Sequence, residues 1–263
     1  MIDDLSATLA AAAFGDAPGT WPLPAAVTPR QRWLRAVAAG GQGRYGSALA
    51  ELAALYRQPP GPLASLAHST RASFLRQLGW HDAARGWDGR AAALAGDDPE
   101  ALADALIGLA ADALGVGRFA ASQRALDRAA EVLPDAEPAR LPVRFAWVSA
   151  ELAMARGDGA AAVRHAETGV GVAAALGSTR HAVKSDVVLA AALCCSGDLE
   201  ASRRVADAAL QATERHGLIP LRWALASLLA GIGSAVLSPQ QVVALRDACA
   251  AQVRSRGGVW ALD

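Results

Sequence analysis

The stretch from Ser196 to Leu210, SGDLEASRRVADAAL, decides the fold of this 263-residue chain. It breaks at Gly197 and continues at once in a run rich in alanine, the residue with the highest helix propensity. Glycine tolerates the left-handed backbone conformation with which many helices end. The stretch therefore predicts the end of one helix, a tight turn, and a second helix that runs back along the first.

The same turn recurs at nearly regular intervals along the chain, at Gly43, Gly79, Gly117, Gly157 and Gly197. Seven residues before each glycine stands an alanine: Ala36, Ala72, Ala110, Ala150 and Ala190. Five residues after each glycine stands another small residue: Ala48, Ala84, Ser122, Ala162 and Ser202. Twelve residues after it stand Leu55, Ala91, Ala129, Gly169 and Ala209. Small side chains on facing sides let two helix axes approach to about 8–10 Å, so these columns predict the contact positions of helix hairpins.

The chain is therefore expected to contain a series of antiparallel helix pairs. Their expected ranges are 29–57, 62–95, 99–132, 139–175 and 179–216, with a degenerate last pair at 220–256. Capping residues followed by proline, at Thr28 and Asp98, support two of these starts, and Ser238 followed by Pro239 indicates a helix start inside the last pair. Residues 1–28 are expected to form an amphipathic capping helix and a proline-rich connector, and residues 257–263 a tail. Stacked pairs would share one continuous core, so we expect a single repeat domain over 29–256.

At this point the chain resembles the tetratricopeptide repeat (TPR) family. The features that carry the resemblance are the small residue before the turn, the turn glycine, and the small residues after it. Pro60 and Pro134 also stand at the same distance after their turn glycines, where that family often ends its second helix. The long period is similar to variant repeats of bacterial signalling and regulatory proteins. The resemblance implies an all-α, right-handed α-solenoid of about five to six helix pairs, with the first helix of each pair on the concave side.

Candidate partner-binding residues follow from that concave side. They are Arg30, Trp33, Ser69, Ser73, Arg76, Asp104, Arg144, Trp147, Glu151 and Lys184. Arginine recurs three residues before tryptophan in two of the helices, which places the two side chains on one face. Such pairs are common in interface hot spots. Burial of both tryptophans between helices is the alternative interpretation.

Composition limits the classes of partner. The net charge is +0, so no overall field favours nucleic acid or anionic lipid, and we expect neither as a direct partner. The chain has three cysteines, Cys194, Cys195 and Cys249. An odd number cannot all pair in intramolecular disulfides, which favours a reducing compartment. The adjacent pair is expected to be buried. The N-terminal segment carries acids where a secretory signal carries bases. A cytoplasmic location is the resulting expectation.

Motifs of catalysis are not found in the sequence. The segment Gly41–Gly46 has the form G-x-G-x-x-G, but the expected structure before it is a helix, whereas dinucleotide binding requires a strand. The five histidines lack zinc-site spacing, and there is no nucleophile elbow. We therefore expect no catalytic, cofactor or metal site, and a protein that is not an enzyme.

Two functions remain. The first is a scaffold that binds a protein or peptide along its concave face. The second is a module that senses a small molecule or a signalling peptide in a bacterial regulatory system. Homodimerisation through an apolar terminal pair, with Leu228, Leu229 and Val236, is a further expectation.

Overall fold

The computed structural model describes residues 2–136 and 139–261, and over these ranges the chain is helical with no β-strand. The helices are α1 (Ile2–Phe14), α2 (Pro29–Gly41), α3 (Tyr45–Leu55), α4 (Pro62–Gln77), α5 (His81–Leu94), α6 (Pro99–Gly115), α7 (Phe119–Val132), the short 3₁₀ helix η1 (Leu133–Asp135), α8 (Arg140–Ala155), α9 (Gly159–Leu176), α10 (Thr179–Ser196), α11 (Leu199–Arg215), α12 (Ile219–Ile232) and α13 (Pro239–Ser255). Within the described ranges no helix combines the length and the apolar character needed to cross a bilayer.

The helix pairs expected from the sequence are confirmed, with boundaries within two residues of the expected ones. Local sequence fixes their starts. The Thr28 and Ser238 side chains accept the backbone N–H of Gln31 and Gln241, and both glutamines return the bond in full capping boxes. Asp98 accepts the N–H of Ala101 at 2.8 Å. Each cap satisfies a backbone donor that the first helical turn leaves free.

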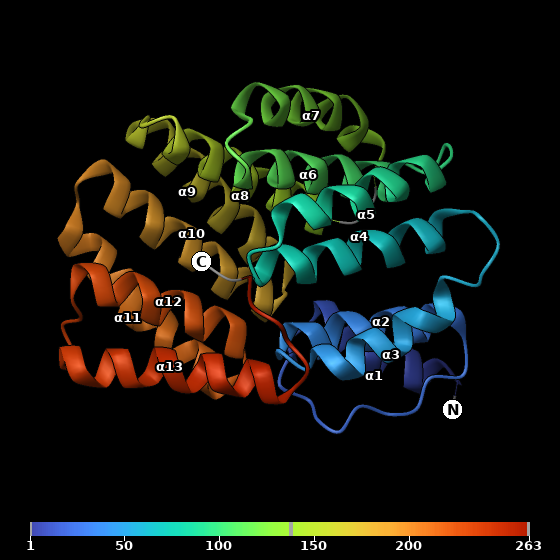
Figure 1. Ribbon diagram of the computed structural model, residues 1–263, viewed down its shortest axis with the longest axis horizontal. Helices are drawn as coiled ribbons and strands as arrows, with labels where there is room; N and C mark the ends of the chain where they lie inside the picture. The colour runs from blue at the N-terminus through green and yellow to red at the C-terminus, as the bar shows by residue number, and fades with distance from the viewer. Residues whose placement is uncertain (1, 137–138, 262–263) are drawn as a thin grey trace.

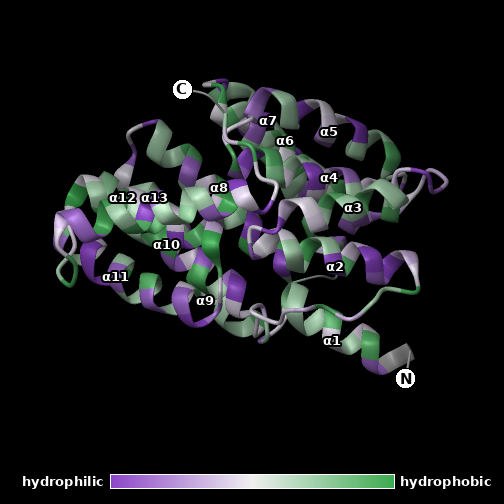
Figure 2. Ribbon diagram, turned by 60° about the horizontal axis from the view of Figure 1, so that its bottom comes forward, coloured by the Kyte–Doolittle hydropathy of each residue, from purple (hydrophilic) through white to green (hydrophobic). Residues whose placement is uncertain are grey.

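The repeat columns lie where the helices meet. All five turn glycines have positive φ, from +73° at Gly117 to +92° at Gly197. The alanines seven residues before the glycines and the small residues five residues after them are completely buried. The third column is buried as well. Most of the labelled helices in Figure 2 carry both hydrophilic and hydrophobic residues, as expected for helices with one face in a core.

Consecutive pairs stack side by side, and the first helix of each pair contacts the first helix of the next. The inner row is thus α2, α4, α6, α8, α10 and α12, and the row curves around a centre (Figure 1). The second helices of the pairs pack on the outer side of this row. Because the row curves, the side chains of its six helices converge.

The two ends of the array meet. The N–H of Gly46, at the start of α3, donates to the carbonyl oxygen of Arg256 at 2.8 Å, and Arg256 donates to the carbonyl of Gln42 at 2.9 Å. Helix α1 packs on α2 and also contacts α10, where Thr179 N–H donates to the carbonyl of Gly15 at 3.1 Å. Helix α1 therefore bridges the first and fifth pairs, which the expectation of a cap at one end did not include.

The C-terminal tail also connects the two ends of the helix array. Ala261 N–H donates to the carbonyl of Leu78 at 2.8 Å, and the indole N–H of Trp80 donates to the carbonyl of Val259 at 2.8 Å. The rings of Trp260 and Trp223 lie 4.4 Å apart between centroids. Residues 257–261 therefore pack against both the last and the second helix pair (Figure 1).

Two expectations about surface residues are corrected. Leu229 is 1% exposed in the core shared with α13, so it offers no dimer surface, whereas Val236 is exposed. Cys195 is exposed and Cys194 half-buried, so the expected burial of this pair is wrong. Both cysteines lie in the last turn of α10, where the chain from Ser196 to Glu200 is also exposed.

Candidate functional site

The inner row of helices surrounds a cavity of about 380 Å³. Its walls come from all six first helices, together with Phe14 at the end of α1 and His81 at the start of α5. The walls combine three tryptophans, two phenylalanines and a set of charged side chains. The cavity exists because the array curls back on itself, which brings α12 opposite α2 and α4.

Nearly all of the candidate residues line this cavity. They are Trp33, Ser69, Ser73, Arg76, Asp104, Arg144, Trp147, Glu151 and Lys184. Arg30 does not: it is exposed, and its guanidinium lies 4.3 Å from the ring centroid of Trp33, outside the cavity. The two Arg–Trp pairs are therefore not equivalent, because Arg144 points into the cavity and is paired there with Asp104.

The two tryptophans link neighbouring repeats. Trp33 Nε1 donates to Thr70 Oγ1 at 2.9 Å, and Trp147 Nε1 donates to Ser185 Oγ at 2.8 Å. Trp33 is 1% exposed, so most of it belongs to the core, while Trp147 is half-buried and stacks on the His181 ring at 5.4 Å. The indoles pack between helices, as the alternative interpretation expected, and one side of each forms cavity wall. Contact of either tryptophan with a partner stays a prediction.

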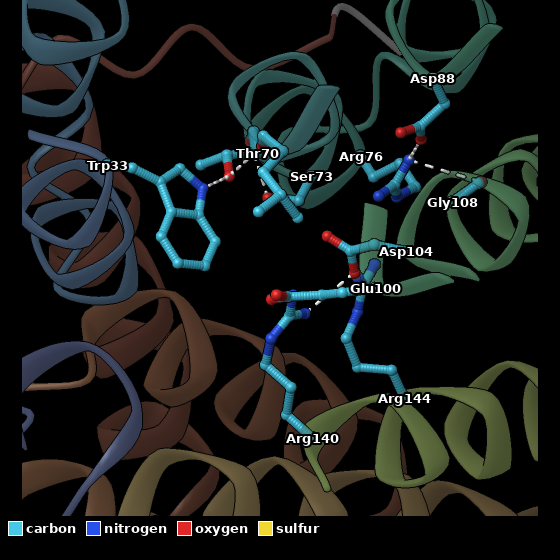
Figure 3. A network of polar contacts seen from close by, with 11 residues as sticks. Trp33, Thr70, Ser73, Arg76, Asp88, Glu100, Asp104, Gly108, Arg140 and Arg144 are labelled. Carbon is cyan, nitrogen blue, oxygen red and sulfur yellow. Dashed lines mark hydrogen bonds and ion pairs between the residues drawn. The ribbon is translucent and has the colours of Figure 1, made fainter. Parts of the chain in front are cut away.

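A buried ionic cluster joins α4, α5 and α6 beside the cavity (Figure 3). Arg76 Nη1 donates to Asp88 and, at 2.8 Å, to Asp112 Oδ1. Both carboxylates are fully buried. Burial raises the pKa of Asp88 to about 7; the positive charge of Arg76 lowers this pKa and the negative charge of Asp112 raises it further. Burial also raises the pKa of Asp112. One guanidinium therefore faces two carboxyl groups, and a proton on one of them neutralises the cluster.

Gly108 makes this cluster possible. A Cβ atom at this position of α6 would collide with the carboxylate of Asp88. The glycine lets α5 approach α6 closely enough for Asp88 to reach Arg76. The two ion pairs of the cluster hold Arg76 in the cavity wall.

A second ionic network joins α6 and α8. Arg140 donates to Glu100 at 2.8 Å and to Asp104 at 3.0 Å, and Arg144 pairs with the same Asp104 (Figure 3). The two arginines lie one helical turn apart and extend from α8 toward the acids of α6. Asp104 is thereby shared between two guanidinium groups.

Helix α10 repeats the pattern of α8. Arg180 and Lys184 stand one period of the repeat after Arg140 and Arg144. Lys184 Nζ lies 3.3 Å from Glu151. Arg180 donates to the carbonyl of Ala13 at 3.1 Å, and its Nε is buried without a hydrogen-bond partner among the described residues.

Sequence reasoning missed several cavity residues. The most important are Phe14, Arg140, Arg180, His181 and Trp223. The sequence did contain a signal for the arginines. Four residues before Asp104, Arg144 and Lys184, which are equivalent positions of successive repeats, stand Glu100, Arg140 and Arg180. Phe14 and Trp223 lie outside the five regular repeats, so no column indicated them.

No family model and no curated protein matches this sequence. Among the described residues no group of three or more metal-ligating side chains comes together. The arrangement of the cavity suits non-covalent binding, because rigid aromatic walls stand beside fixed cationic groups.

Proposed function

We propose that this protein is a cytoplasmic, non-enzymatic binding module with the TPR-like, right-handed α-solenoid architecture. In this proposal it holds a small molecule or a short signalling peptide in the central cavity and acts on a second protein of a bacterial regulatory system. The alternative, a scaffold that binds a protein along an open concave face, stays a prediction.

The observation that carries the proposal is the cavity itself. Its volume of about 380 Å³ lies within the range of roughly 300–1,000 Å³ typical of small-molecule pockets. A stable protein partner usually covers about 800 Å² on each side. The concave residues that a protein partner would need face one another across this small space. They support a compact ligand better than a folded partner.

The chemistry of the walls supports binding without catalysis. Asp104 and Glu151 are both held in ion pairs with cavity cations. The Ser73 hydroxyl donates to the backbone carbonyl of Thr70, and His181 Nδ1 is hydrogen-bonded to Ser178 rather than to a cavity hydroxyl. Neither of these contacts pairs a nucleophile with its own general base, which is the pattern of covalent catalysis.

Filling the cavity tests the proposal. Ala111 lines it from α6 and is only partly buried, so Ala111→Trp would place an indole in the ligand space. Ala174 is exposed on α9, and Ala174→Trp serves as the matched control. A library of metabolites and short peptides is screened by thermal unfolding of the wild type, where a ligand at about 100 times its Kd stabilises the fold by roughly 2.7 kcal/mol.

We expect compounds that stabilise the wild type and the control but not Ala111→Trp. If no compound stabilises the wild type, or if every stabilising compound acts equally on Ala111→Trp, the cavity is not the ligand site and the proposal is wrong.

A further inference from the structure

We propose that the cavity is specific for an organic anion, with the anionic group against Arg180 and Arg144 and an apolar or aromatic body against Trp147, Trp223 and Leu221. This inference rests on the proposed function and adds the chemical class of the ligand.

The first argument is the balance of charges around α8 and α10. Three guanidinium groups, on Arg140, Arg144 and Arg180, line this side of the cavity. The carboxylates paired with them are Glu100 and Asp104, and Asp104 is divided between two of the arginines. Arg180 has no carboxylate partner among the described residues: it donates to the backbone carbonyl of Ala13, and its Nε atom is buried and unpaired. Burial of a charge without a counter-charge costs free energy. An anionic ligand would supply the negative partner that the Arg180 guanidinium lacks.

The electrostatic state of neighbouring groups agrees with an excess of positive charge. Burial, and then the charge of Arg140, lowers the pKa of Arg180 to about 10. The pKa of Arg144 is also lowered to about 10, first by burial and then by Arg76. Burial and the charges of Arg180, Arg140 and Arg144 hold the pKa of His181 well below its ordinary value. His181 is therefore neutral and adds no cation of its own.

The second argument is that the guanidinium groups are held in place before a ligand arrives. The Phe14 ring has Arg140 at 5.3 Å and Arg180 at 5.9 Å from its centroid. Arg180 is further fixed by its bond to the Ala13 carbonyl, and Gly41 leaves the space that its side chain occupies, since a Cβ there would contact Arg180 Cδ. A fixed planar donor loses little entropy when it binds a carboxylate or another oxyanion.

The third argument is the apolar remainder of the wall. Trp147 stands beside the arginines, and Leu221, Trp223 and Ala224 come from α12. An inorganic ion would leave these surfaces in contact with water. A ligand with one anionic group and an aromatic body would use both parts of the cavity.

Two fluorescent probes of nearly the same shape separate this inference from the proposed function. Anilinonaphthalene sulfonate carries an aromatic body and one sulfonate, whereas N-phenylnaphthylamine has the same aromatic body without the charge. Titrations measure the affinity and stoichiometry of both probes with the wild type, with Ala111→Trp, and with three arginine variants. Arg180→Met removes the unpaired charge, Arg180→Lys retains it, and Arg164→Met removes an exposed arginine of α9 as the control.

We expect the sulfonate to bind one-to-one, at least about tenfold more tightly than the neutral probe, because charge-assisted hydrogen bonds are about twice as strong as neutral ones. Arg180→Met is expected to weaken sulfonate binding about tenfold without changing the affinity of the neutral probe. Arg180→Lys and Arg164→Met are expected to retain most of the sulfonate affinity, and Ala111→Trp to abolish binding of both probes.

Equal wild-type affinity for the two probes overturns the anion specificity and leaves cavity binding intact. The same conclusion follows if Arg180→Met is folded and binds the sulfonate as the wild type does. Failure of both probes to bind the wild type, or unchanged binding in Ala111→Trp, overturns the inference together with the proposed function. If Arg180→Met does not fold, judged by circular dichroism, the comparison of the two probes on the wild type decides the question.

Discussion

The buried carboxyl group of Asp88 makes the stability of this protein depend on pH in a specific direction. Its pKa is about 7 in the folded state, against 3.8 for an exposed aspartate. Between these values the folded chain holds a proton that the unfolded chain has released. The free energy of unfolding therefore falls as pH rises from about 4 toward 7, because the unfolded state binds fewer protons.

The magnitude follows from the size of the shift. Each pKa unit corresponds to about 1.4 kcal/mol, so this group removes up to about 4 kcal/mol of stability over the whole interval. Between pH 5 and pH 7.5 the expected loss is about 2–3 kcal/mol. Neighbouring groups that also titrate or carry charge are Asp112, His81 and Arg76.

The substitution Asp88→Asn tests the titration of the Asp88–Asp112 pair, because the amide has the shape of the protonated acid and cannot ionise. We expect the stability of the variant relative to wild type to rise by about 2–3 kcal/mol between pH 5 and pH 7.5. Urea unfolding followed by circular dichroism at both pH values measures this difference, which includes the change that the substitution causes in the titration of Asp112. A difference between variant and wild type that is the same at both pH values would refute the reasoning.

Two further predictions concern the repeat. Ala150→Leu is expected to destabilise the fold by about 1–3 kcal/mol, because Ala150 is fully buried where helices touch. The control Ala174→Leu, on the exposed side of α9, should change stability by less than about 0.5 kcal/mol. Urea unfolding of both variants measures the two effects, and equal effects would contradict the assignment of Ala150 to a helix contact. Gly197→Ala is expected to cost about 1–2 kcal/mol because φ is +92° there, whereas Gly171→Ala, in the exposed middle of α9 with open space around it, should stabilise by about 0.5–1 kcal/mol. Thermal melts of the two glycine variants should shift in opposite directions, and a shift in the same direction would be evidence against the left-handed turn.

Part of the candidate site was predictable because it shares the period of the fold. Once Gly157 and Gly197 were recognised as equivalent turns, the inner face of each first helix followed from counting back along it. That is why Arg144, Trp147 and Lys184 were found to line one cavity. Arg30 departs from the same rule: it is exposed in the first turn of α2, and its guanidinium lies over the Trp33 ring outside the cavity.

The sequence by itself determined the helices, their turns and the buried columns, because these depend on interactions between residues close in the chain or one repeat apart. Alanine at a contact position and glycine at a left-handed turn act locally, and the same spacing of these residues recurs in five helix pairs. Only the tertiary structure decided that the array closes, because closure depends on contacts such as Gly46 with Arg256 and Leu78 with Ala261, which lie far apart in the chain and belong to no repeat. Closure also turned an open concave face into a cavity with Phe14 and Trp223 in its walls, because it brings α1 and α12 beside the inner helices of the regular repeats. Arg180 lies in the same wall, with its Nε unpaired among the described residues.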